Sequence, residues 1–318
     1  MIRYNTYSQY LKTKYGERVY KLPVNLCLTC PNRDGTAGIG GCIFCGEDGA
    51  AFENLPRTMS VSEQIAENMS FIGKKYKANK FIAYFQNYSN TYIPLSTFKE
   101  YITAARADNI VEIAISTRPD CIRDDYLDFL REFSENTGIN ISLELGLQSV
   151  NCHTLAKINR AHSLAEFIDA VLAIHRFGFP VCAHLILNLP WDDDCDVIEC
   201  AKVLSALRAD QVKLHSLYIP KGTPLEKMYL DGEIDMGTYH DYVRRVVEFL
   251  EYLSPDVVIQ RLIGRASEEK TVFSNYGTSW WKIKDTIDAV LEEKNTYQGR
   301  LCTYLGGSAL NKKFGKTE

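Results

Sequence analysis

The chain of 318 residues lacks the features that mark several large classes of protein. No run approaches the roughly 18 consecutive apolar residues that a membrane-spanning helix needs. The first residues, Met1 to Asn5, contain no apolar core of the kind that a secretory signal peptide has. Glycine and proline, at 20 and 10 residues, are too few for a collagenous or low-complexity chain. We therefore expect a soluble cytoplasmic protein with no membrane partner.

The chain also lacks an excess of positive charge. Its 36 lysines and arginines oppose 40 acidic residues, which leaves a net charge of −4. Because this bulk charge repels phosphate, any contact with a nucleic acid must come from local basic patches. An apolar fraction of 46% and a charged fraction of 24% are ordinary for a globular chain that buries a core. The length is within reach of one large α/β barrel domain.

Cysteine, by contrast, is abundant, with ten residues. Four of them form two Cys-x-x-Cys pairs separated by eleven residues: Cys27, Cys30, Cys42 and Cys45. Two cysteines at this spacing can direct both thiolates to one metal centre, and four glycines let the intervening loop fold back. The pattern alone fits a four-thiolate zinc site, a mononuclear iron site, or three ligands of a [4Fe–4S] cluster. The other six cysteines are interpreted as small buried apolar residues.

Extended apolar segments alternate with amphipathic helices after the cysteine loop. Repeated strand–helix units predict a parallel sheet with right-handed crossovers, so we expect an α/β fold, namely a partial (β/α)6 TIM-like barrel. Residues 1–255 would form this barrel, including the cysteine loop, and residues 256–318 a C-terminal extension and tail. The expected strands are Lys21–Leu26, Lys80–Phe85, Ile110–Ser116, Asn140–Gly146, Phe179–Leu187 and Gln211–Tyr218, with one more at Asp256–Leu262 in the extension.

Capping residues and apolar spacing predict several helices. Two capping boxes, which begin at Ser60 and Ser163, each precede an apolar helical pattern. A further helix is expected at Ile122–Glu135, and one at about 283–293 in the extension. The first three of these lie between expected strands, as crossover helices do.

Polar residues cluster in or after the expected strands, near the carboxyl ends where ligands bind in such folds. They are Asn87, Ser89 and Asn90 after the second strand, Ser116 in the third, Glu144 and Gln148 in and after the fourth, His184 in the fifth, and Lys213 and His215 in the sixth. Strand alternation places Lys213 and His215 on one face, which we expect to point, like His184, into the barrel lumen. Polar groups at successive strand ends predict a ligand site there.

A cysteine loop after the first strand of a six-unit partial barrel resembles the radical S-adenosylmethionine superfamily. Several sequence phrases are similar to its YtqA/YhcC-type subfamily, which is itself similar to the catalytic subunit of elongator. These phrases are Cys30–Thr36, Gly40–Cys45, Glu144–Ser149, Ile158–His162 and Pro220–Leu225. The resemblance covers nearly the whole chain and implies two cofactors, a [4Fe–4S] cluster and S-adenosylmethionine.

The same resemblance implies which cysteines bind the cluster. It assigns Cys30, Cys42 and Cys45 as ligands, whereas Cys27 falls where the subfamily more often has a small residue. The amino and carboxylate groups of S-adenosylmethionine would chelate the fourth iron. Reductive cleavage would then give methionine and a 5′-deoxyadenosyl radical, which takes a hydrogen atom from the substrate.

The remaining candidates also have roles that the resemblance implies. Arg160 would bind the carboxylate of S-adenosylmethionine, because a guanidinium group matches that geometry. Glu144 and Gln148 would bond the ribose hydroxyls or orient Arg160. The residues expected around the methionine amino group and elsewhere in the cofactor site are Asn87, Ser89, Asn90 and Ser116. The residues expected on the substrate side, with a catalytic role, are His184, Lys213 and His215.

For the subfamily, the resemblance implies modification of the tRNA wobble uridine, from 5-carboxymethylaminomethyluridine to 5-aminomethyluridine. The expected partners are tRNA, an electron donor such as flavodoxin or ferredoxin, and a downstream methyltransferase. The basic residues that could contact the RNA are Lys74, Lys75, Lys77, Lys80, Arg244, Arg245, Lys312, Lys313 and Lys316. Two alternatives stay open, a radical enzyme that acts on a small metabolite or peptide, and a non-catalytic zinc-knuckle protein that binds RNA.

Overall fold

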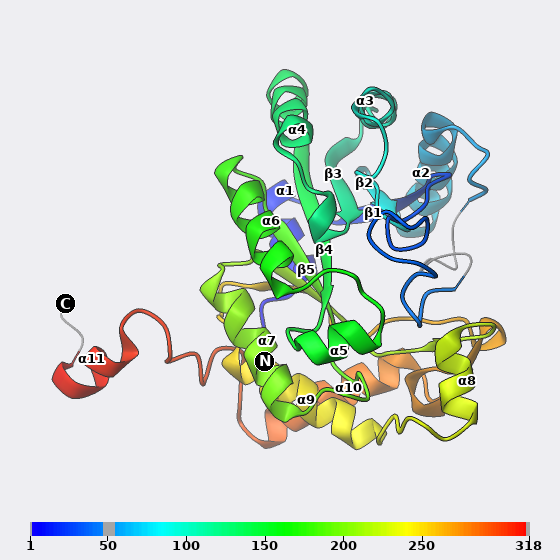
Figure 1. Ribbon diagram of the computed structural model, residues 1–318. Coiled ribbons are helices and arrows are strands. Elements are labelled where there is room, and N and C mark those ends of the chain that lie inside the picture. The colour runs from blue at the N-terminus through cyan, green and yellow to red at the C-terminus, as the bar shows by residue number, and fades with distance from the viewer. Residues whose placement is uncertain (1, 47–54, 316–318) are drawn as a thin grey trace.

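A sheet of seven parallel strands forms the centre of the computed structural model, which describes residues 2–46 and 55–315. The strands are β1 (Val19–Asn25), β2 (Lys80–Gln86), β3 (Ile110–Thr117), β4 (Asn140–Gln148), β5 (Val181–Ile186), β6 (Gln211–His215) and β8 (Val258–Arg261). Their order in the sheet follows their order in the chain. The sheet therefore curls into an open half-barrel and has no point where the strand order reverses (Figure 1).

Helices connect the strands and cover the outer face of the sheet (Figure 1). The connecting helices are α2 (Val61–Tyr76), α3 (Leu95–Ala104), α4 (Asp124–Thr137), α5 (Cys152–Lys157), α6 (Leu164–Arg176) and α7 (Asp194–Ala206). The others are α1 (Tyr7–Tyr15) before β1, α8 (Pro224–Leu230) and α9 (Tyr239–Tyr252) before β8, and α10 (Trp280–Glu293) and α11 (Ser308–Phe314) after it. Within the described ranges, no helix is long and apolar enough to cross a membrane.

Three 3-10 turns and a small two-stranded sheet complete the fold. The turns are η1 (Pro119–Cys121), η2 (Glu268–Lys270) and η3 (Asn275–Gly277), and the small sheet pairs β7 (Ile219–Pro220) with β9 (Thr271–Phe273) in antiparallel fashion. The last helix, α11, projects away from the body of the molecule (Figure 1).

The two faces of the main sheet differ in polarity. Leu22 and Val24 of β1 are fully buried in the apolar core between the strands and the outer helices. Lys21, the residue directly before Leu22, must point to the inner face because side chains alternate along a strand. Near the start of β1, Leu11 of α1 packs in the lumen against Val19 and Ile82. Glu112 of β3 lies opposite Ile82 and pairs with Lys14 of α1 at 3.1 Å, so this end of the lumen combines apolar side chains with one ion pair.

The elements expected from the sequence are present. Each expected strand overlaps an observed one, and the strand placed in the C-terminal extension joins the sheet as a seventh strand, with Gln211 of β6 opposite Val258 of β8. Both capping boxes form at the starts of α2 and α6. The segment expected as a helix at Ile122–Glu135 is α4, which buries the apolar face that its spacing predicts. The domain boundary at residue 255 stays a prediction.

Candidate cofactor and substrate site

The cysteine loop follows β1 and lies at the carboxyl end of the parallel strands (Figure 1). Cys42 is buried, Cys30 and Cys45 are partly buried, and Cys27 is exposed. Burial raises the pKa of the Cys45 thiol, Arg33 lowers it, and the neighbouring thiols of Cys42 and Cys30 raise it again. Three of the four cysteines therefore lie within electrostatic reach of one another, and Cys27 lies at the surface.

Side-chain hydrogen bonds hold the cysteine loop in place. Arg33 Nη2 donates to the carbonyl oxygen of Cys45 at 2.8 Å. Asn159 Nδ2, from the segment after α5, donates to the carbonyl oxygen of Gly41 at 2.7 Å. Asn32 Nδ2 donates in return to the carbonyl oxygen of Asn159 at 2.5 Å. The segment Ile158–His162, which carries part of the family resemblance, is thus bound directly to the cysteine loop.

Arg160 lies between the cysteine loop and the end of β4. Its Nη1 donates to Cys42 Sγ at 3.5 Å, and its Nη2 donates to the carbonyl oxygen of Gly146 at 2.6 Å. A Cβ on Gly146 would lie 2.7 Å from Arg160 Nη2 and 2.8 Å from Gln148 Nε2, so glycine makes this close approach possible. Arg160 Nε is buried and has no partner among the described residues.

Arg118 belongs to the same site, although it was not among the predicted site residues. Its side chain is 2% exposed and forms two hydrogen bonds to the Asp120 carboxylate, at 2.8 and 2.7 Å. Its Nη1 donates to the carbonyl oxygen of Arg160 at 2.9 Å and lies 4.0 Å from Cys30 Sγ. The signal in the sequence is the polar run Ser116–Asp120 that follows the third strand.

The loop after β2 brings three predicted residues to this site. Ser89 Oγ lies 3.9 Å from Cys30 Sγ. Asn90 Nδ2 donates to the carbonyl oxygen of Ser116 at 2.7 Å and so joins the ends of β2 and β3. The Oδ1 atoms of Asn87 and Asn90 are buried and have no partner in the described part of the chain. Because buried acceptors are normally satisfied, two unsatisfied ones here fit an ammonium donor.

Backbone strain is concentrated around the same residues. Five of the ten non-glycine residues with positive φ border this site: Asn87 (75°), Tyr88 (51°), Gln148 (75°), Asn159 (53°) and Ala161 (57°). Such conformations cost free energy and persist where the surrounding structure, often a ligand site, holds them.

Glu144 lies deeper in the lumen and organises the residues expected on the substrate side. Its side chain is buried, forms ion pairs with Lys21 and with Lys213 at 3.2 Å, and is hydrogen-bonded to His184 Nε2 at 2.7 Å. Burial favours a higher pKa for Glu144, but Lys21, Lys213 and His184 hold that pKa well below its ordinary value of 4.5. His184 and Lys213 therefore face the lumen, as the sequence predicts. Glu144 contacts these groups, and its role towards Arg160 or the ribose stays a prediction.

His215 also faces the lumen, beside Arg261 of β8. Arg261 Nη2 lies 2.7 and 2.8 Å from the two ring nitrogens of His215, whose ring centroid is 5.5 Å from that of His184. Burial lowers the pKa of His215 well below 6.5, as does the charge of Arg261. Burial likewise lowers the pKa of His184, to about 4. Both imidazoles are therefore neutral near neutral pH, so the cations at this level are Lys21, Lys213 and Arg261.

One group in the lumen resembles a metal site. The ligand atoms of Glu144, Cys182 and His184 all lie within 4.8 Å of one another. However, Lys21 and Lys213 contact the same carboxylate, and burial raises the pKa of Cys182 well above its ordinary value, which keeps the thiol protonated. A metal ion needs a thiolate and an available carboxylate. We therefore interpret this group as an ion-pair network.

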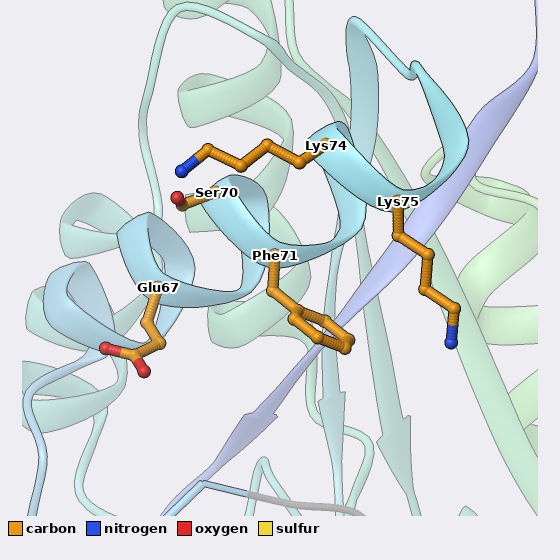
Figure 2. Close-up of a pocket in the computed structure, with 5 residues that line it drawn as sticks. All are labelled: Glu67, Ser70, Phe71, Lys74 and Lys75. Atoms are coloured by element: carbon orange, nitrogen blue, oxygen red, sulfur yellow. The ribbon is translucent and has the colours of Figure 1, made fainter.

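The basic residues expected to contact RNA have different surroundings. Lys74 and Lys75 are exposed on α2, where they flank Phe71, whose ring is 64% exposed (Figure 2). Arg244 and Arg245 of α9 instead pair with Asp194 of α7, at 2.5 and 3.3 Å. Lys77 is exposed, Lys80 pairs with Glu17, Lys312 and Lys313 lie on the projecting α11, and Lys316 lies outside the described residues.

Comparison with known protein families bears directly on this arrangement. Residues 27–204 match the family described as the radical SAM superfamily, and residues 209–293 match the radical SAM C-terminal domain. The chain belongs to the radical SAM superfamily. Membership in this superfamily implies an enzyme that uses a [4Fe–4S] cluster and S-adenosylmethionine (SAM).

Individual relatives agree with this assignment. The chain is 35% identical over 299 residues to the uncharacterized protein YtqA of Bacillus subtilis, a match that covers 94% of this chain and 92% of that one. It is 27% identical over 156 residues to human elongator complex protein 3, covering 48% of this chain and 27% of that protein. The structure of the Methanocaldococcus infernus protein Elp3 superposes with a TM-score of 0.66 at 16% identity, covering 88% of this chain and 64% of that one. The last comparison confirms the fold.

The residues at the carboxyl end of the sheet fit the cofactors of the superfamily. Cys30, Cys42 and Cys45 supply three neighbouring thiols, the donor set that would hold a cluster with one iron open to SAM. The unsatisfied oxygens of Asn87 and Asn90 would accept from the SAM amino group. The guanidinium of Arg160, with its unpartnered Nε, would donate to the SAM carboxylate.

Replacement of Arg160 tests its part in SAM binding. Arg160→Ala is expected to weaken the affinity for SAM about ten- to a hundredfold, because losing a hydrogen bond to a charged group costs about 1.5–3 kcal/mol. Iron content should be unchanged, since Arg160 is not a ligand of iron. Equilibrium dialysis of SAM against anaerobically reconstituted protein measures the affinity, and iron analysis of the same protein measures the iron content. The control is Arg131→Gln on the outer helix α4, which should bind SAM normally; normal binding by Arg160→Ala would instead assign the carboxylate to another cation.

Proposed function

We propose that this radical SAM enzyme modifies the wobble uridine of tRNA, converting 5-carboxymethylaminomethyluridine to 5-aminomethyluridine. The observation that carries the proposal is the cationic lumen beside the cofactor site, where Lys21 and Lys213 pair with one carboxylate, Glu144, and Arg261 lies beside His215. Such a lumen suits a substrate that carries a carboxylate. The similarity to elongator complex protein 3 and to the YtqA/YhcC-type subfamily supports uridine in tRNA as the bearer of that group.

The cofactors and the chain would divide the chemistry between them. When bound, the cluster and SAM supply a 5′-deoxyadenosyl radical, which can take a hydrogen atom from a carbon that has no acidic proton. Loss of this hydrogen atom and of one electron to the redox partner protein would leave an imine at the carboxymethyl carbon, and water would cleave it to the 5-aminomethyl group and glyoxylate. Lys213 would bind the substrate carboxylate, and the neutral imidazoles of His184 and His215 would donate or accept hydrogen bonds at the amino side of the same group. Leu11 and Val19 would contribute apolar surface to the lumen beneath this group.

The proposal requires a base that can leave its stack. Nucleotides of an anticodon loop are unpaired, so placing one base in the barrel costs less free energy than it would from a duplex. The exposed Lys74 and Lys75 on α2 lie near Phe71 and Glu67, and these two lysines could contact phosphates (Figure 2). Binding of tRNA should accordingly weaken as salt is added.

Nucleoside mass spectrometry tests the proposed function. Transfer RNA that bears 5-carboxymethylaminomethyluridine is incubated with reconstituted enzyme, SAM and a reductant. We expect this tRNA to stimulate formation of 5′-deoxyadenosine and to lose its carboxymethyl group, whereas the same tRNA with an unmodified uridine does neither. Unchanged nucleosides beside rapid turnover on a pool of metabolites would contradict the tRNA proposal and support a small-molecule substrate.

A further inference from the structure

A cavity opens along the gap between β1 and β8, where the half-barrel does not close. Its volume is about 730 Å³, and residues of the N-terminal segment, both edge strands and the start of α10 line it. None of the lining residues is acidic. The basic ones are Lys21, Lys213, Arg261, Arg265 and Lys284, and the aromatic ones are Tyr4, Tyr7, Tyr20, Tyr84 and Trp280.

Most of these cations already have a partner. Lys21 and Lys213 share Glu144, which lies behind the cavity wall. Lys284 pairs with Asp288 at 2.6 Å, and the Arg265 guanidinium lies 4.3 Å from the centre of the Trp280 ring. Each of these four cations therefore has an ion-pair or aromatic partner.

Arg261 differs from the other cations of the cavity. Among the described residues, its hydrogen-bond partner is the His215 ring, and its Nε is buried without any partner. No carboxylate of the described chain pairs with this guanidinium. The Arg261 side chain is partly buried, and Glu144 acts on it without forming an ion pair. A guanidinium withdrawn from water without a paired carboxylate lowers stability, so its presence needs a reason beyond folding. Arg261 lies opposite Lys213 across the β6–β8 pairing, so a ligand that meets one meets both.

We infer that Arg261 anchors a binding site for an oxyanion carried on a planar group, with the planar part held in the cavity between β1 and β8. The guanidinium presents parallel N–H donors that match a carboxylate or phosphate. The tyrosines and Trp280 of the wall present ring faces against which a planar group packs. The identity of the oxyanion rests on the proposed function. If the substrate is a uridine of tRNA, the oxyanion is the carboxylate of the uridine side chain or a phosphate of the RNA.

Simple planar ligands test the site without reference to tRNA. Benzoate and benzamide have nearly the same shape and differ in charge, and their binding to the reconstituted full-length protein can be measured by calorimetry. The wild-type protein should bind benzoate at least about tenfold more tightly than benzamide, as expected for a charge-assisted contact. Arg261→Gln should bring this ratio close to one, whereas the exposed-surface control Arg131→Gln should keep it.

Two further measurements separate a binding role from a structural one. The melting temperature of Arg261→Gln should equal or exceed that of the wild type, because the substitution removes an uncompensated cation from a crowded lumen. Arg261→Lys keeps the charge without the planar fork, and it should lose most of the preference for benzoate. A benzoate preference that survives in Arg261→Gln, or a protein that binds benzoate and benzamide equally, would overturn the site.

Nucleosides then distinguish the source of the oxyanion. A gain in affinity from uridine to 5-carboxymethyluridine that disappears in Arg261→Gln would identify the side-chain carboxylate. A gain that appears only with uridine 5′-monophosphate would identify a phosphate. If benzoate binds through Arg261 and no uridine derivative does, the anion site stands and the tRNA proposal fails. If the protein shows no preference for benzoate but still modifies tRNA, the anion site fails and the tRNA proposal stands.

Discussion

Replacing Cys30, Cys42 or Cys45 with alanine is expected to abolish the [4Fe–4S] cluster. In the predicted assignment, these three thiolates bind three of the four irons and SAM binds the fourth, so the loss of one thiolate would leave too few to retain the cluster. Each variant should lose nearly all of its iron and the broad absorbance at about 400 nm that is expected of the reconstituted wild-type protein. Iron analysis and absorbance after anaerobic reconstitution measure the effect.

Cys27→Ala is the matched control, because it removes a thiol from the same loop. Cys27 is exposed, whereas the three proposed ligands are buried or partly buried. The Cys27→Ala variant should therefore keep its cluster. Loss of the cluster in Cys27→Ala together with its retention in Cys30→Ala would reverse the assignment. A colourless protein that binds zinc through all four cysteines would contradict the prediction of a [4Fe–4S] cluster and would support the zinc-knuckle alternative.

The strands were predictable because their signal is local. A buried parallel strand such as β2 shows a continuous apolar run, Phe81–Phe85, and polar residues on either side limit its ends. Helix α1 carries no such signal, because it buries only Leu11 and has no side-chain cap. Its position depends on distant residues, as the bridge between Thr6 and Ile259 shows. Contacts between residues so far apart in sequence cannot be read from composition or periodicity.

The residues of the candidate site also differ in whether a local sequence signal predicts them. Residues that follow a strand end, such as Asn87 and Ser89, were predictable because parallel strands bring their carboxyl ends to one edge. Lys21 and Arg261 were missed because each owes its environment to a partner on another strand, Glu144 and His215 respectively. To predict how far along the barrel axis a residue lies, one also needs the register between strands, which periodicity alone does not provide.

The buried carboxylate of Glu144 should dominate the stability of the lumen. Glu144→Gln is expected to lower the free energy of unfolding by about 3–5 kcal/mol at neutral pH, because removing one partner of a buried ion pair leaves the other charges uncompensated. Here those charges are Lys21 and Lys213. Urea unfolding of the full chain measures the change. Asp128→Asn breaks an exposed ion pair with Arg131 and should cost no more than about 1 kcal/mol.

The pH dependence of this difference shows whether the charge of Glu144 is responsible. Because its folded-state pKa lies well below the ordinary value of 4.5, Glu144 stabilises the fold at pH values above 4.5. That contribution is lost as the pH falls through the folded-state pKa, where the carboxylate takes up a proton. Glutamine cannot titrate, so the gap in stability between the wild type and Glu144→Gln should be full near neutral pH and should narrow below about 4.5. A gap that stays constant down to about pH 3 would contradict the electrostatic explanation and attribute the effect to shape and packing.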